Sequence, residues 1–117
     1  MRHQVKKNRL ARPRGQRNLL LSTLATDLIL HEKIKTTEAK AKALQPYIDK
    51  VVNEAKRPEK ALAIRSVNQY LTNELSAKKL IEKIGKKYAD KQSGYTRIVR
   101  LGFRSGDAAP LVQIELV

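Results

Sequence analysis

The residues best suited to chemistry are the cationic side chains at the start of the chain. A guanidinium can clamp a phosphate with two hydrogen bonds and stack on a base, whereas an ammonium acts as a point charge. A terminal block of such residues is typical of a nucleic-acid-binding arm, the alternative being a tail that only keeps the protein soluble. Residues 1–17 contain no acid and seven such cations, five of them arginines: Arg2, Lys6, Lys7, Arg9, Arg12, Arg14 and Arg17.

A second basic and aromatic cluster lies near the other end of the sequence. Tyr95 and Arg97 begin an apolar segment, and Phe103 and Arg104 follow it in a Gly-rich stretch. Arginines can contact phosphates, and aromatic rings can stack on unpaired bases. Tyr95 and Phe103 are equally suited to a hydrophobic core, and the sequence leaves that alternative open. Arg97 and Arg100 must lie on opposite faces of a strand, because side chains alternate.

Lysines recur along one predicted helix and allow two interpretations. They are suited to a further phosphate-facing surface and equally to ordinary solubilisation of a helix. The set comprises Lys78, Lys79, Lys83, Lys86 and Lys87.

The sequence contains no pattern typical of an active site. Its two histidines, His3 and His31, have no second histidine at metal-binding spacing, and cysteine is absent. No Gly-rich loop is followed by Lys and Ser or Thr, as a phosphate-binding loop would require. We therefore expect no enzyme activity, no cofactor, no metal site and no small-molecule substrate.

The charge balance indicates an anionic partner. The chain has 25 Lys and Arg against 11 Asp and Glu, giving a net charge of +14, of which residues 1–17 carry half. An excess this large opposes compaction unless a partner neutralises it. No apolar run approaches the roughly 20 residues that span a bilayer. The most basic segment also lacks the apolar face of a membrane-surface helix, so we expect no membrane partner.

Hydrophobic periodicity divides the chain into a basic arm, residues 1–15, and one globular domain, residues 16–117. Apolar residues at helical spacing predict helices over 16–31, from residue 38, from Pro58 and after Asn73. Pro46 predicts a kink or a restart in the second of these. Residues 33–36, 95–101 and 111–117 read as strands, with a long loop at 102–110. The class is α+β, with helices packed on one face of a small sheet.

Several segments together resemble a known family. Gly94-Tyr95-Thr96-Arg97-Ile98, Gly106-Asp107-Ala108-Ala109-Pro110 and Ile114-Glu115-Leu116-Val117 are similar to the C-terminal signature of protein seventeen of the bacterial large ribosomal subunit. Met1-Arg2-His3 and the stretch from His31 to Thr37 resemble that family too.

The resemblance implies a fold and a partner. The fold would be four helices on a small mixed three-stranded sheet, which combines the strand near Ile34 with the C-terminal hairpin, plus an extended basic N-terminal arm. The partners would be large-subunit ribosomal RNA near the polypeptide exit tunnel and neighbouring ribosomal proteins, in the cytoplasm rather than an organelle. The expected RNA-binding residues are Arg2, His3, Lys6, Lys7, Arg9, Arg12, Arg14, Arg17, Lys35, Tyr95, Arg97 and Arg104.

Two other classes of function fit the charge. A DNA-architectural protein would bind any duplex through its phosphates. A membrane-surface or acidic-partner module ranks last, because the basic segment has no apolar face.

Overall fold

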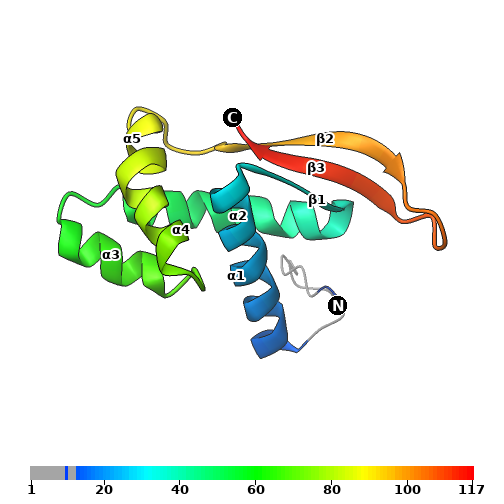
Figure 1. Cartoon of the computed structure of the whole chain (residues 1–117), viewed down its shortest axis with the longest axis horizontal. Coiled ribbons are helices and arrows are strands. Elements are labelled where there is room, and N and C mark those ends of the chain that lie inside the picture. The colour runs from blue at the N-terminus through cyan, green and yellow to red at the C-terminus, as the bar shows by residue number, and fades with distance from the viewer. Residues whose placement is uncertain (1–9, 11–12) are drawn as a thin grey trace, which may run out of the picture.

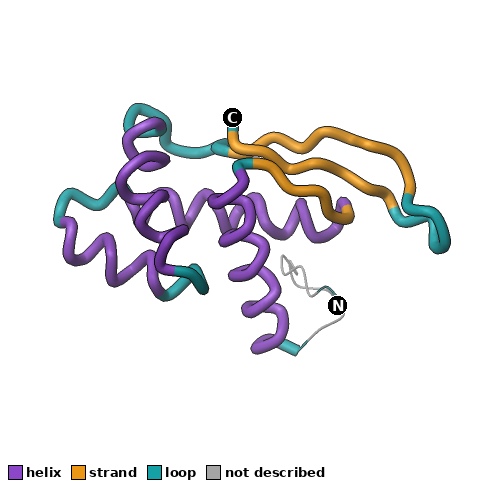
Figure 2. The backbone as a smooth tube through the Cα atoms, in the orientation of Figure 1, coloured by secondary structure: helices purple, strands orange, loops and turns teal. Residues whose placement is uncertain are grey.

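A computed structural model describes residue 10 and residues 13–117 (Figures 1 and 2). The elements follow the order α1 (Arg14–His31), β1 (Lys33–Thr37), α2 (Glu38–Ala55), α3 (Lys60–Asn68), α4 (Glu74–Lys79), the π-helical segment η1 (Leu80–Ile84), α5 (Gly85–Lys87), β2 (Thr96–Phe103) and β3 (Pro110–Leu116). Because α4, η1 and α5 form one continuous helical run, the α+β class with four helices on a three-stranded sheet is confirmed.

The sheet has the order β1-β3-β2, and both neighbouring pairs are antiparallel. The prediction of a mixed sheet is therefore wrong. β1 and β2 do run parallel to each other, but β3 lies between them and separates them. The prediction that the strand near Ile34 joins the C-terminal hairpin is correct, since Ile34 pairs with Ile114 of β3.

The core lies between the sheet and the helices on one of its faces (Figure 1). Ile34, Ile114 and Ile98 form one row across the three strands, and Ile114 is fully buried in it. Helix α2 passes under the sheet and supplies buried side chains at helical spacing. These are Ala41, Ala43, Leu44, Ile48, Val51, Val52 and Ala55.

Helix α2 runs without interruption through Pro46, so the predicted restart does not occur. Helix α3 begins at Lys60 rather than at Pro58, and it buries Ala63 and Val67. Ile64, in the same helix, is exposed.

Gly85 occupies the place where the fourth helical run packs most closely. A Cβ atom there would lie 3.2 Å from the carbonyl oxygen of Leu80 and 3.8 Å from that of Ala55 in α2. Glycine costs a helix about 1 kcal/mol relative to alanine. The close approach of α2 and the local π-helical turn explain why glycine stands at this position.

Tyr95 anchors the start of β2 to the end of α2. Its side chain is fully buried, and its hydroxyl accepts a hydrogen bond from Lys56 Nζ at 2.9 Å. The oxygen lies 2.6 Å from Asn53 Oδ1 and 2.7 Å from the carbonyl of Lys91, and its single proton serves one of these acceptors at a time. The ring packs against that of Tyr88, with 5.1 Å between centroids.

We expect Tyr95→Phe to lower the free energy of unfolding by about 1–3 kcal/mol. The substitution removes the hydroxyl, so the buried groups that bonded to it lose that partner. Urea unfolding followed by circular dichroism measures the change. Phe103→Leu, at a side chain that is 75% exposed, is the control. A loss below about 0.5 kcal/mol, the scale of ordinary surface changes, would contradict the anchoring role.

Candidate nucleic-acid interface

Most of the predicted arm lies outside the described residues: Arg2, His3, Lys6, Lys7, Arg9 and Arg12. Two further predicted RNA-binding residues, Arg14 and Arg17, lie in the first turn of α1. That turn contains no acidic residue. Cations are unfavourable at the positive end of a helix dipole, where anions are stabilised. Two arginines at this point therefore suit an external anion better than they suit the helix itself.

The face of the sheet opposite the helices gathers the predicted strand cations. We call it the outer sheet face and define it by Lys33, Lys35, Arg97, Val99, Gln113 and Glu115.

Two cross-strand rows build this face. Lys33, Glu115 and Arg97 lie side by side in one row, and Lys35, Gln113 and Val99 in the next. Lys33 was not among the predicted site residues. Strand alternation could have found it, since Lys33 and Lys35 are two residues apart and share a face.

Arg97 is held in place on the outer sheet face by a carboxylate. Its Nε and Nη2 atoms both donate to Glu115 Oε1, at 3.0 and 2.7 Å. Glu115 sits on the central strand between Arg97 and Lys33, so two cations flank one acid. The row keeps a positive charge while the guanidinium has a fixed orientation.

Arg104 is held in the same way in the hairpin loop. Its Nε donates to Asp107 Oδ1 at 3.0 Å, and its Nη2 pairs with Oδ2. Asp107 Oδ1 also accepts from the backbone N–H of Ala109 at 3.2 Å. These hydrogen bonds, led by those from Arg104, lower the pKa of Asp107 from 3.8 to about 2. At neutral pH the Asp107 carboxylate is therefore charged and pairs with Arg104.

Tyr95, one of the predicted RNA-binding residues, lies in the hydrophobic core. Its ring is fully buried, and its hydroxyl is engaged by Lys56 and the end of α2. A buried ring cannot stack on a base, so the core interpretation holds for Tyr95. Phe103 is the opposite case, since its side chain is 75% exposed and the core interpretation does not apply.

The helical lysines do not form one uniform surface. Lys79 Nζ donates to the carbonyl of Leu30 at 3.1 Å, and Lys87 Nζ lies 5.3 Å from the centroid of the Tyr88 ring. These two contacts are structural ones. Lys79 is partly buried, whereas Lys78, Lys83, Lys86 and Lys87 are exposed.

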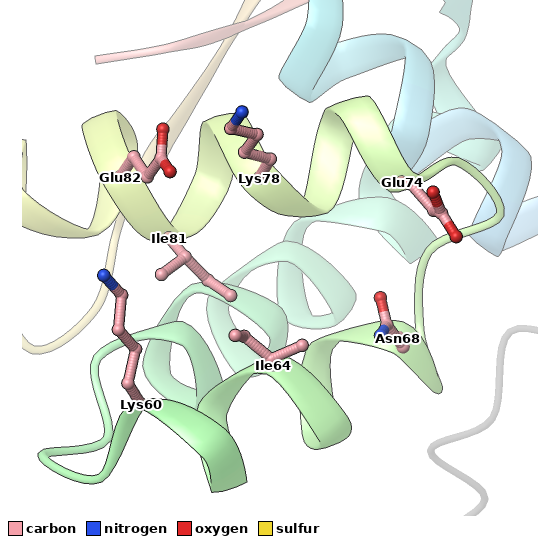
Figure 3. Close-up of a pocket in the computed structure, with 7 residues that line it drawn as sticks. All are labelled: Lys60, Ile64, Asn68, Glu74, Lys78, Ile81 and Glu82. Carbon is pink, nitrogen blue, oxygen red and sulfur yellow. The ribbon is translucent and has the colours of Figure 1, made fainter.

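A groove of about 350 Å³ lies between α3 and the fourth helical run (Figure 3). Ile64 and Ile81 point toward each other across it. Two lysines and two glutamates balance the charge around them, so the groove adds nothing to the basic surface. The lining residues are Lys60, Ile64, Asn68, Glu74, Lys78, Ile81 and Glu82.

The described part of the chain offers neither a metal cluster nor a membrane-spanning helix. No group of three or more His, Cys, Asp or Glu residues there is arranged to hold a metal ion. Within the same residues, no helix is both long enough and apolar enough to cross a membrane.

The fold and these surfaces define a small basic α+β protein with cations gathered on one face of its sheet. The sequence model of the family described as ribosomal protein L17 matches residues 20–117. The large ribosomal subunit protein bL17 of Neorickettsia sennetsu is 41% identical over 117 residues, covering all of both chains. The bL17 proteins of Rickettsia typhi and Hyphomonas neptunium are each 42% identical over the whole of this chain, which covers 85% and 83% of their lengths.

The chain therefore belongs to the ribosomal protein L17 family. This confirms the family resemblance that the terminal and central segments indicated.

The Arg104–Asp107 pair predicts an unusual titration. Because the folded pKa of Asp107 is lowered, its contribution to stability is present above about pH 4 and is lost as the pH falls through about 2. We expect the carboxyl carbon shift of Asp107, followed by NMR, to titrate with a midpoint of about 2. Arg104→Gln should raise that midpoint toward 3.8. A wild-type midpoint near 3.8 would show that the pair does not form in solution.

Proposed function

We propose that this protein is a structural component of the large ribosomal subunit that binds and stabilises large-subunit ribosomal RNA. Family membership supports the ribosomal assignment, since its relatives are named as large-subunit proteins. The single structural observation that carries RNA binding is the outer sheet face, where Lys33, Lys35 and Arg97 project away from the helices.

The proposed mechanism is charge neutralisation combined with shape recognition. Phosphate contacts fix the register and orientation of a protein on a nucleic acid. We assign that task to the arm, from Arg2 to Arg17, and to Lys33, Lys35, Arg97 and Arg104. Arg97 and Arg104 meet the RNA already oriented by Glu115 and Asp107, so less conformational freedom is lost on binding.

The proposed location and partners rest on the family resemblance of the sequence. We infer a position near the polypeptide exit tunnel, with the arm extending among RNA helices and neighbouring ribosomal proteins in contact with the domain. The proposed compartment is the cytoplasm, and the proposed role is structural and not catalytic.

A sedimentation experiment tests the assignment. We expect the protein to travel with large subunits through a sucrose gradient and a high-salt wash, and to leave that fraction after ribonuclease treatment. Blotting the gradient fractions of a cell lysate measures this. Recovery at the top of the gradient would contradict the ribosomal proposal. Recovery with DNA would favour the DNA-architectural alternative.

The salt dependence of RNA binding tests whether the cations near the start of the chain neutralise phosphates. If the seven cations of residues 1–17 each neutralise a phosphate, log K should fall with log salt at a slope of roughly −5 to −6 from these residues alone. Removing residues 1–12, which hold five of those cations, should reduce the slope by about 3.5 to 4.5. Filter binding of the purified protein to transcribed large-subunit RNA measures both. A reduction of about 1 or less would contradict the arm's role.

A matched pair of double variants distinguishes RNA binding by the outer sheet face from RNA binding by the exposed helical lysines. Lys33→Gln with Lys35→Gln should reduce the slope by about 1.4 to 1.8, because two phosphate contacts are lost. Lys83→Gln with Lys86→Gln removes the same charge from exposed helical positions and should leave the slope unchanged. An equal reduction from both pairs would show that charge, and not the outer sheet face, determines binding.

A further inference from the structure

A cleft opens under the β2–β3 hairpin, on the side away from the outer sheet face. The hairpin extends past the start of α2 (Figure 1), and two adjoining hollows of about 210 and 560 Å³ lie between them. Glu38 and Pro110 line both hollows, so the two lie side by side and together form the cleft. Phe103 and Arg100 form the hairpin wall, and Lys42 lies on the wall of α2.

The two walls carry cations that share one acid. Glu38 Oε1 lies 2.9 Å from Lys42 Nζ and 3.7 Å from Arg100 Nη2, so it holds the two cations near each other across the cleft. Lys42, which bonds to the carboxylate directly, is the main cause that lowers the pKa of Glu38. Arg100 remains 83% exposed and available to an outside ligand. Two cations against one acid leave the cleft positive.

Phe103, the aromatic residue of the hairpin wall, is largely exposed to solvent. Phe103 is the only phenylalanine of the chain, and 75% of its side chain is exposed. It follows a bulge in β2 at Leu101, where Gly102 takes a φ of 129°, a conformation that favours glycine. The bulge bends the strand, as bulges do when they re-aim a side chain. Here it sets Phe103 opposite Pro110 at the mouth of the cleft.

We propose that this cleft binds one unpaired nucleotide of RNA, with the base stacked on Phe103 and the adjoining phosphate at Arg100 and Lys42. The inference rests on the proposed RNA-binding function. Phe103 and Arg100 belong to the cluster that the sequence offered for stacking and phosphate contact, and the cleft adds Lys42 from α2 and an unpaired base as the ligand.

The combination of groups favours RNA over a protein segment. An apolar protein side chain would use Phe103 but would supply no anion for the second of the two cations, since Lys42 and Arg100 share the single charge of Glu38. A nucleotide satisfies both, because it carries a flat π-face and a phosphate on one unit. Only an unpaired base can present that face to an aromatic side chain, since paired bases are stacked within their helix.

Photo-cross-linking from residue 103 tests the proposal directly. The full chain would carry p-benzoylphenylalanine in place of Phe103 and be incorporated into large subunits in cells. We expect irradiation to join it to one unpaired nucleotide of the large-subunit RNA, read by primer extension. The same group at Leu19 or Leu75, which are 62% and 69% exposed on other faces, should not mark that nucleotide. A cross-link to a protein, to a paired nucleotide or to nothing would overturn the proposal.

Binding to transcribed large-subunit RNA gives an independent test. Phe103→Leu keeps an apolar side chain but removes the π-face, so affinity should fall about fivefold to a hundredfold with the salt slope unchanged. Arg100→Gln should lower affinity and reduce the slope by about 0.7 to 0.9. Leu75→Ala, at a residue of α4 that is 69% exposed, is the control and should change neither.

Different results would contradict the proposed RNA-binding function and the proposed nucleotide site. Wild-type protein that neither binds the RNA nor sediments with large subunits would remove the proposed function itself. Wild-type protein that does both, while Phe103→Leu binds equally well, would remove only the nucleotide site.

Discussion

The pairing of β3 with both of its neighbours is the constraint on which the rest of the structure depends. β1 and β2 do not pair with each other, so each is part of the sheet only through β3. The same register that buries Ile114 between Ile34 and Ile98 places Glu115 between Lys33 and Arg97 on the other face. Because side chains alternate, a slip of one residue would exchange the two faces. Core packing therefore fixes which side of the sheet is cationic.

The acids of the basic surfaces are placed where they orient cations. Glu115 holds Arg97, Asp107 holds Arg104, and Glu38 connects α2 to the hairpin. Exposed ion pairs of this kind contribute little to stability, with a median near 0–1 kcal/mol. Their value here is geometric, because a long flexible side chain loses fewer conformations on binding when it already has one orientation. A strongly basic protein thus keeps a few acids at its proposed contact surfaces.

Periodicity predicted much of the fold, and tertiary contacts decided the rest. Helix α1 and strand β1 follow from local patterns that agree with their environment, and Asn73 caps α4 as its position indicated, accepting from the Leu75 N–H at 2.7 Å. Tyr95 could not be assigned from sequence, because its burial depends on Lys56, 39 residues earlier. The exposure of Phe103 likewise depends on a bulge that no local signal specified. That the strand near Ile34 joins the hairpin was predicted only through the family resemblance, since alternation shows faces but not neighbours, and the strand order itself was not predicted.

The position of β3 in the chain also has a consequence during synthesis. A polypeptide emerges from its N-terminal end, so every other described helix and strand is made before residues 110–116. Until then β1 and β2 have no partner strand, and open strand edges favour association with other chains. The basic residues 1–15, in contrast, precede nearly all of these elements in the chain and are made before them. A nascent chain of this protein is thus able to engage an anion well before its own sheet can close.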